Sequence, residues 1–176
     1  MNLTGKCLIA RPDINDALFK RSVIYIYEHT EQGTAGLILN KRRKDLSAVD
    51  VFLNRGFAPV DQSIPVYHGG PVNEKAVVLL HTNEWQSSNT MAVDNQLSVT
   101  SDDLMFYKFN NGNVPNGYKF CTGVAVWHPQ QIVAEINCNH WLTNQLSLST
   151  ILDYEGRELW DRAVTLAAKH TIDRYI

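Results

Sequence analysis

The sequence predicts a single α+β domain over residues 1–176, built from antiparallel strands and a few helices. Apolar runs rich in β-branched and aromatic residues alternate irregularly with helical patterns, and several of the strand patterns adjoin one another as hairpins do. A regularly alternating parallel fold would instead place a helix between successive strands. The chain has 176 residues, of which 44% are hydrophobic and 19% charged, a length and composition that suit one hydrophobic core.

The first strands are predicted at Cys7–Ala10 and Ser22–His29, because both runs are apolar and contain β-branched or aromatic residues. The segment "EQGTAG" then supplies glycines for a turn into a third strand at Leu37–Asn40. We therefore expect a hairpin formed by the second and third strands.

A first helix is predicted after the basic run "KRRK", Lys41–Lys44. Asp45 or Ser47 can cap its N-terminus, and Gly56 is a suitable stop. The helical spacing predicts one buried face, made by Leu46, Val49 and Leu53.

Short strands are then predicted at "IPVY", "AVVLLH", "TMAV" and "QLSVT", and a longer one at Tyr118–Trp127. Ser101 precedes Asp102 and Asp103, which is the order that a helix N-terminus favours, so a second helix is expected there.

Two more helices are predicted in the last third of the chain. Pro129 stands where a first helical residue is expected, with Ile132 and Ile136 one turn apart. The last helix is expected over residues 155–169, because its apolar residues form one broad face: Leu159, Trp160, Ala163, Val164 and Ala167.

Composition excludes several classes of protein. The formal net charge is -2, which gives no overall attraction to a polyanion. The N-terminus "MNLTGKCLIARPD" lacks the apolar region of a signal peptide, and no apolar run reaches membrane-spanning length. The three cysteines, Cys7, Cys121 and Cys138, are far apart and lie beside apolar residues, so a cytoplasmic protein with reduced, buried thiols is expected.

Several motifs, taken in order, resemble the AlgH/YqgE family of bacterial proteins over almost the whole chain. They are "LIARP", "FKRSVIYIYEH", "GTAGLILNK", "VYHGGPV", "LLH" and "GVAVWHPQQIVAEINCNHWL". The resemblance implies a strongly bent, mostly antiparallel mixed sheet, barrel-like in shape and packed by three to four helices. It also implies a cytoplasmic protein of a family labelled as transcriptional regulators, and it transfers no established biochemical activity.

The motif "VYHGGPV" contains no nucleotide-binding glycine pattern. Gly69 or Gly70 can adopt positive φ, and Pro71 restricts the residue before it to extended backbone, so the segment predicts a rigid corner between strands. The alternative is a backbone surface that approaches a ligand, which makes His68 and these three residues candidate binding residues.

Other candidate binding residues lie at strand ends: Glu28, His29, Asn40 and His81. If the runs that end at His68 and His81 pair as a hairpin, roughly 20 Å separates the two imidazoles, too far for one metal ion, although parallel pairing could reunite them. Glu28 and His29 are adjacent in a strand and point to opposite faces, so they form no dyad without a bulge. We therefore predict no metal site, no cofactor and no catalytic residue.

The segment around Trp127 and Trp141 is predicted to be structural, because tryptophans at a strand-to-helix corner usually lie in the core. Gln131 and Glu135 share a helical face, and one of them could hold a neighbouring backbone group.

The sequence as a whole predicts a binding or regulatory protein that acts through an unidentified protein or small molecule, as a monomer or a small homo-oligomer. No two helices are adjacent, so a helix-turn-helix and specific DNA binding are not expected, and "KRRK" offers phosphate contacts at most. The alternative is a small hydrolase-like enzyme, which should bring at least two of Glu28, His29, His68 and His81 into one cleft.

Overall fold

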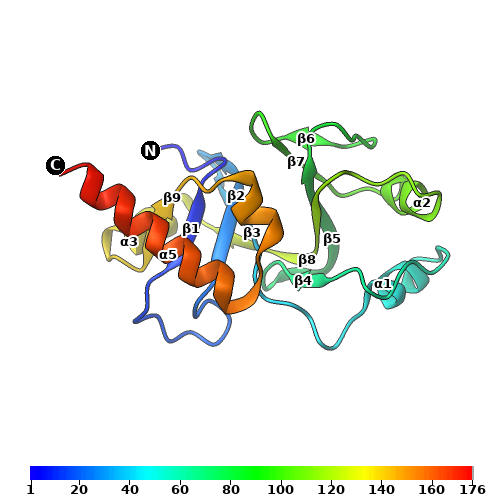
Figure 1. Ribbon diagram of the computed structural model, residues 1–176, viewed down its shortest axis with the longest axis horizontal. Coiled ribbons are helices and arrows are strands. Elements are labelled where there is room, and N and C mark those ends of the chain that lie inside the picture. Colours follow the sequence, from blue (N-terminus) through cyan, green and yellow to red (C-terminus); the bar gives the residue numbers. More distant parts are fainter. Residues whose placement is uncertain (176) are drawn as a thin grey trace.

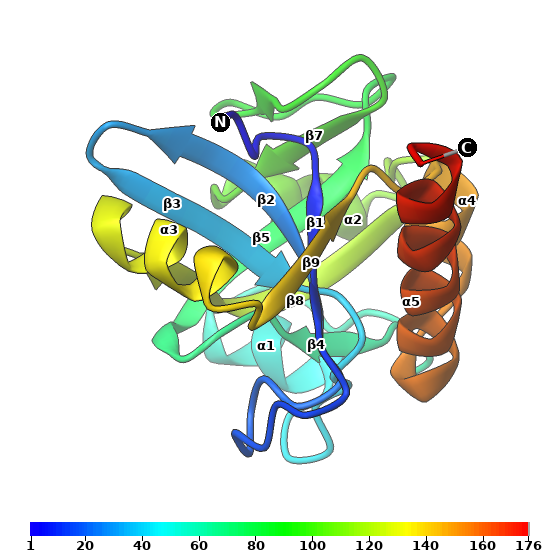
Figure 2. The same cartoon turned by 90° about the vertical axis from the view of Figure 1, so that its left-hand side faces the viewer.

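The strands form one strongly curled sheet in the computed structural model, which describes residues 1–175 (Figures 1 and 2). Its order is β6-β7-β5-β8-β3-β2-β1-β9, and β4 joins β8 beside this path. All strand pairs are antiparallel except β4 with β8, which is parallel. The sheet is therefore mixed and mostly antiparallel, as predicted. The strands are β1 (Cys7–Ala10), β2 (Val23–Thr30), β3 (Gly33–Ile38), β4 (Val66–His68), β5 (Val72–Thr82), β6 (Met91–Ala92), β7 (Leu97–Thr100), β8 (Tyr118–Trp127) and β9 (Trp141–Asn144).

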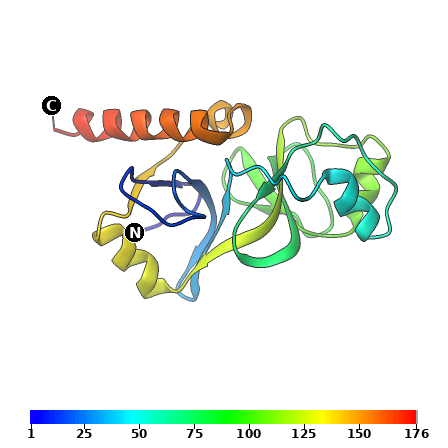
Figure 3. The same ribbon diagram turned by 90° about the horizontal axis from the view of Figure 1, so that it is seen from below.

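Helices cover both faces of this sheet (Figure 3). They are α1 (Ala48–Asn54), α2 (Leu104–Asn110), α3 (Pro129–Asn137), α4 (Leu148–Asp153) and α5 (Gly156–Asp173). Both faces of β5 are therefore buried. Val78 and Leu80 belong to the core beneath α5, whereas Val77 and Leu79 belong to a second core with α1 and α2. The face opposite α5 carries a third core, under α3, around Trp127 and Trp141. Burial on both faces explains why these strands read as continuous apolar runs.

Strand β4 fills the fork where β3 and β8 separate. The two long strands pair at Gly36 and Ala125, but nearer the start of β8 the partner is β4, with His68 opposite Thr122. On its other side β4 pairs with the chain that follows β3, because the His68 amide donates to the Lys41 carbonyl at 2.7 Å. The local hairpin between β4 and β5 that the sequence suggested does not form, because both strands pair with β8 instead.

The first helix begins and ends near the predicted points but buries a different face. Ser47 and Asp50 form a reciprocal capping box, and Gly56 follows the last turn with φ of +79°. The buried residues are Ala48, Val51 and Phe52, while Leu53 is 53% exposed. The prediction of a face containing Leu53 was wrong, because the aromatic core beneath α1 is built on Phe52.

Several other boundaries differ from the sequence predictions. Most of the "EQGTAG" segment belongs to β3, whose pairing with β2 begins at Gly33. Helix α2 starts at Leu104, and Asp102 accepts the Met105 amide at 2.9 Å, whereas Ser101 bonds to the Val77 carbonyl. Helix α5 extends to Asp173, and the short elements β9 and α4 were not predicted. The prediction that no two helices are adjacent was therefore wrong, because α4 and α5 follow one another with no strand between them.

The start of α5 is fastened to the sheet by buried polar groups. Lys119 is 2% exposed and donates to the carbonyls of Leu39 and Tyr154, at 3.0 and 2.6 Å. Burial lowers the pKa of its ammonium group to about 8. Tyr67 adds a hydrogen bond of 2.6 Å to Glu155.

The cysteines only partly match expectation. Cys7 and Cys121 are fully buried, and burial raises the pKa of each thiol to about 12, so both are unreactive at neutral pH. Cys138 is exposed, which corrects the prediction that all three are buried, because it caps the C-terminus of α3 on the outer surface. Among the described residues, no helix combines the length and apolar character needed to cross a membrane.

Candidate functional site

A cleft of about 700 Å³ lies beside α1, and we call it the α1 cleft. Its walls come from the segment before α1, from α1 itself, from the start of β5 and from the middle of β8. The lining residues are Arg43, Leu46, Val51, Asn54, Arg55, Glu74, Lys75, Val77 and Thr122. The cleft therefore combines apolar side chains with three cations and one carboxylate.

Arg43 is fixed in one wall of the cleft. Its guanidinium donates to both carboxylate oxygens of Asp45, at 3.0 and 2.6 Å, and to the Thr122 hydroxyl at 3.0 Å. The hydrogen bonds from Arg43 hold the pKa of Asp45 at about 2, so the pair stays ionised at neutral pH. The side chain of Arg43 is only 13% exposed, and its remaining N–H groups are held in place by these contacts.

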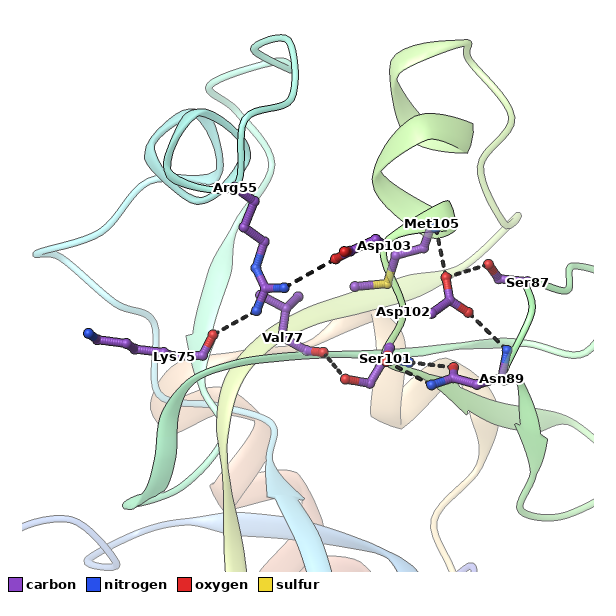
Figure 4. Close-up of polar contacts among 9 residues, drawn as sticks. All are labelled: Arg55, Lys75, Val77, Ser87, Asn89, Ser101, Asp102, Asp103 and Met105. Atoms are coloured by element: carbon purple, nitrogen blue, oxygen red, sulfur yellow. Dashed lines mark hydrogen bonds and ion pairs between the residues drawn. The ribbon is translucent and has the colours of Figure 1, made fainter.

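Arg55 and Lys75 form the opposite rim (Figure 4). Arg55 follows the last residue of α1 and donates to the Lys75 carbonyl at 2.9 Å and to Asp103 at 3.4 Å. Its guanidinium also lies 5.2 Å from the centre of the Phe106 ring. The Lys75 side chain is different, because within residues 1–175 it forms no ion pair with a carboxylate.

A polar network supports this rim from behind (Figure 4). Burial raises the pKa of Asp102, but hydrogen bonds from Ser87 and from the amides of Asn89 and Met105 outweigh that effect and lower it. Ser101 donates to the Val77 carbonyl at 2.6 Å. The start of α2 is thus tied to β5, which fixes Asp103 opposite Arg55.

His68 is the one predicted candidate histidine beside the α1 cleft. Its Nε2 lies 3.1 Å from a carboxylate oxygen of Glu74, which lines the cleft. The other ring nitrogen, Nδ1, is buried without a hydrogen-bond partner among the described residues. Asp45 and Arg43 complete this polar group on the side of β4.

Gly69 and Gly70 form the predicted corner between β4 and β5, but the chief reason for glycine is a close approach of backbones. A Cβ on Gly69 would lie 2.3 Å from the Gly123 carbonyl oxygen, and one on Gly70 would lie 2.0 Å from the Val124 carbonyl carbon. Gly70 also has φ of +158°, at the edge of the extended region. Pro71 is exposed at the end of this corner.

The remaining candidates lie elsewhere and have partners of their own. His29 contacts Thr34 at 2.7 Å and the Met1 carbonyl at 3.1 Å, near the tip of the β2–β3 hairpin. Glu28 is exposed beside it, and the bulge in β2 falls before this pair, so the two side chains point to opposite faces. Asn40 is buried and, within the described chain, its side chain binds backbone groups alone, those of Val23, Arg21 and Gly156.

His81 is fully buried, packed edge-on against Trp85 and hydrogen-bonded to Thr100 at 2.8 Å. Burial lowers the pKa of its imidazole, which favours the uncharged ring. His81 pairs with Tyr118 at the start of β8, whereas His29 lies by Thr34, which pairs with Trp127 at its end. Nine residues of strand separate these positions, up to about 30 Å of chain.

The four titratable candidates therefore do not share a cleft as the hydrolase hypothesis requires. Within residues 1–175, no group of three or more His, Cys, Asp and Glu side chains is arranged to hold a metal ion. The absence of a metal or cofactor in the working protein stays a prediction.

The cations of the α1 cleft were missed by the sequence analysis. Arg43 was seen only as part of the basic run, while Arg55 and Lys75 are isolated in sequence and belong to no motif. They meet only because β4 enters the sheet and brings the segment after β3 close to β8.

Comparison with known proteins shows the family. The family model described as AlgH-like matches residues 7–171, and the chain belongs to this family. A UPF0301 protein of Actinobacillus pleuropneumoniae serotype 5b is 34% identical over 169 residues, covering 92% of this chain and 90% of the relative. A UPF0301 protein of Proteus mirabilis is 31% identical over 172 residues, covering 94% and 92%.

Solved structures agree on the fold. The solution structure of the AlgH protein of Pseudomonas aeruginosa aligns with a TM-score of 0.80 at 28% identity, covering 93% of this chain and 87% of that one. A crystal structure of a Corynebacterium diphtheriae protein aligns with a TM-score of 0.71 at 24% identity, over 93% and 86%. These similarities confirm the predicted family and the bent α+β fold.

Proposed function

We propose that this protein is a regulatory binding protein whose α1 cleft takes a small organic anion. The observation that carries the proposal is the pairing of an apolar floor with fixed cations in one cleft of about 700 Å³. That volume lies in the range of small-molecule sites, and such sites usually combine apolar walls with a few oriented polar groups.

The N–H donors of the cleft favour an anionic group on the ligand, while Glu74, the one carboxylate on the lining, lies against His68. Arg43 and Arg55 are each oriented by an aspartate, so their spare N–H groups would bind with little loss of side-chain entropy. Lys75 adds a positive charge that no carboxylate offsets within the described residues. A carboxylate or phosphate group placed between these three side chains would accept charge-assisted hydrogen bonds.

The apolar part of the cleft favours a ligand with a carbon body. Leu46 is partly exposed and offers apolar surface to a ligand, and Val51 and Val77, which are 5% and 2% exposed, close the base of the cleft. An inorganic ion alone would leave this surface wet, whereas an aromatic or aliphatic body would cover it.

The expected regulatory role is indirect. Ligand binding at the rim would change the contacts among α1, α2 and β5, and thus the outer surface that a protein partner could read. A hydrolase is the weaker candidate, because the hydroxyl on the cleft lining, that of Thr122, is engaged by the Arg43 guanidinium at 3.0 Å rather than by the His68–Glu74 pair.

Titration calorimetry tests the proposal with phenyl phosphate as the probe and benzyl alcohol as its uncharged counterpart. We expect phenyl phosphate to bind more tightly, and Lys75→Met to weaken it on the order of tenfold, as loss of one charge-assisted hydrogen bond predicts. Lys169→Met, on the exposed side of α5, is the matched control and should bind like the wild type. Equal affinity for the two probes, or equal effects of the two substitutions, would contradict an anion site here.

A further inference from the structure

A second cavity, far from the α1 cleft in the fold, has the opposite chemistry. It measures about 450 Å³ and lies where the loop between β1 and β2 meets the end of α3 and the start of β9. We call it the Trp141 pocket. Its lining residues are Asp13, Ile14, Asn15, Asp16, Phe19, Glu135, His140 and Trp141.

Two aromatic rings, those of Phe19 and Trp141, line one side of this pocket, and Trp127 packs behind them. Phe19 packs edge-on against Trp141 with ring centres 5.9 Å apart, and it lies 6.3 Å from Trp127. Trp127 and Trp141 are themselves arranged edge to face at 6.2 Å. Aromatic faces, those of tryptophan above all, attract organic cations through their quadrupole.

Glu135 gives the pocket a negative charge that has no counter-ion. One carboxylate oxygen accepts the indole N–H groups of Trp127 and Trp141, at 3.0 and 2.8 Å, and the other accepts the Gln131 amide at 3.0 Å. All three donors are neutral, and among the described residues no Lys, Arg or His lies within 4.0 Å of this half-buried carboxylate. A cation in the pocket would supply the missing charge.

These hydrogen bonds also strengthen the aromatic wall. An indole that donates its N–H to a carboxylate gains electron density on its ring, and hydrogen-bonded groups in a partly buried site polarise one another. The same carboxylate therefore attracts a cation directly and through Trp141, the tryptophan on the lining. A cation-binding role goes beyond the structural role that the sequence analysis predicts for Glu135 and the tryptophans around it.

The other charged groups around the pocket leave its net charge negative. Asp16 uses one oxygen to accept the amides of Leu18 and Phe19, both at 2.9 Å, and it forms no ion pair in the described part of the chain. Asp13 lies 4.0 Å from Arg11, which offsets its charge. His140 is the one basic side chain on the lining among the described residues, against the three carboxylates of Asp13, Asp16 and Glu135.

We propose that the Trp141 pocket binds an organic ammonium ion, held by the faces of Phe19 and Trp141 and balanced by Glu135. A metal ion does not fit this arrangement, because within residues 1–175 no three His, Cys, Asp or Glu side chains are placed to hold one, and Glu135 is already engaged by three donors. An alkylated ammonium group suits it, because such a group is weakly hydrated and its alkyl surface can lie against the rings.

The test compares choline with 3,3-dimethyl-1-butanol, which has the same shape without the charge. The readout is the indole N–H signals in nitrogen-15 NMR spectra at pH 8, where the chain's four tryptophans give separate reporters. We expect choline to shift the signals of Trp127 and Trp141 and to leave those of Trp85 and Trp160 in place. The neutral alcohol should bind at least about tenfold more weakly.

Two conservative substitutions make the test specific. Asp16→Asn keeps the oxygen that accepts the two turn amides and removes the charge, and Glu135→Gln keeps an oxygen for the indoles. Each should weaken choline binding severalfold and leave the weak binding of the alcohol unchanged. A trimethyllysine peptide that binds more tightly than choline would identify a protein side chain as the source of the cation, whereas tighter choline binding would identify a free small molecule.

Two results would overturn the proposal. One is a choline titration in which no indole signal of Trp127 or Trp141 moves. The other is equal binding of choline and the alcohol, which would leave an apolar pocket without cation selectivity.

Discussion

Gly69 and Gly70 are the residues at which one added methyl group should do most harm. A Cβ on Gly69 would lie 2.3 Å from a backbone oxygen of β8, and that strand is paired on both sides and has little room to move. We expect Gly69→Ala to lower the free energy of unfolding by about 3 kcal/mol, measured by chemical denaturation.

Gly112→Ala is the matched control for this prediction. Gly112 has φ of +74°, and no atom of residues 1–175 lies within 4 Å of an added Cβ, so its substitution costs only the backbone strain, about 1 kcal/mol. If Gly69→Ala proves no more destabilising than Gly112→Ala, the close approach of the two backbones does not control stability.

Lys119 should make the protein more stable as the pH rises from 7 to 9. Its pKa falls from 10.5 to about 8 on folding, so between these values the unfolded chain binds more protons, and raising the pH favours the folded state. The expected gain from this residue is about 1 kcal/mol between pH 7 and pH 9.

Comparison with Lys119→Met isolates this effect. Cys7 and Cys121 act in the opposite direction from about pH 8 upward, because their pKa values rise on folding from 9.0, but both thiols remain in the variant and cancel in the difference. Denaturation at the two pH values should show a gain in the wild type relative to the variant. An equal pH response in both proteins would mean that Lys119 is not charged and desolvated at pH 7.

Among the elements, the start of α5 is also held by the side chain of Asn40, which lies just after β3. Asn40 accepts the Val23 amide at 2.9 Å and donates to the Arg21 and Gly156 carbonyls at 2.8 and 2.9 Å. Asn40→Ala would leave three buried backbone groups unsatisfied, so we expect a loss of about 3 kcal/mol in unfolding free energy. His29→Ala, in the same set of sequence candidates but partly exposed, should cost less than half as much. If Asn40→Ala cost less unfolding free energy than His29→Ala, Asn40 would not stabilise the fold.

The elements also show what a sequence can and cannot predict. Strand β8 was predicted to the residue, and α3 began at Pro129, because a long apolar run and a helix-starting proline are local signals. The four residues of β9 and the six of α4 are too short to show a period. The pairing of β4 with β8 joins segments about fifty residues apart, which no local pattern encodes.

For the whole molecule, we predict no sequence-specific DNA binding. Most charges of the basic run are engaged, since Arg42 pairs with Glu155 at 3.1 Å and Arg43 with Asp45 at 2.6 Å. Lys41 donates to the Lys20 carbonyl, and burial lowers the pKa of its ammonium group. Labelled duplexes titrated at two salt concentrations should bind weakly and without preference, and weaker still at the higher salt. Tight binding that distinguishes one duplex from another would refute this.

The candidate site, like the sheet, is a property of the whole chain. The sequence marked His68 and the glycine corner beside it, because these carry local motifs. The sequence did not indicate Arg55 or Lys75 as candidates, because they line the cleft only through the position of α1 against β5 and β8. Charge placed by long-range pairing leaves no trace in a single sequence.

The most direct test of the proposed function is a map of where an organic anion binds. Phenyl phosphate titrated into nitrogen-15-labelled protein should shift backbone amide signals at Arg43, Arg55, Lys75 and Thr122, which lie apart in sequence and meet only in the α1 cleft. Signals of the Trp141 pocket should stay in place. Shifts that gather elsewhere, or an equal response to benzyl alcohol, would contradict an anion-binding α1 cleft.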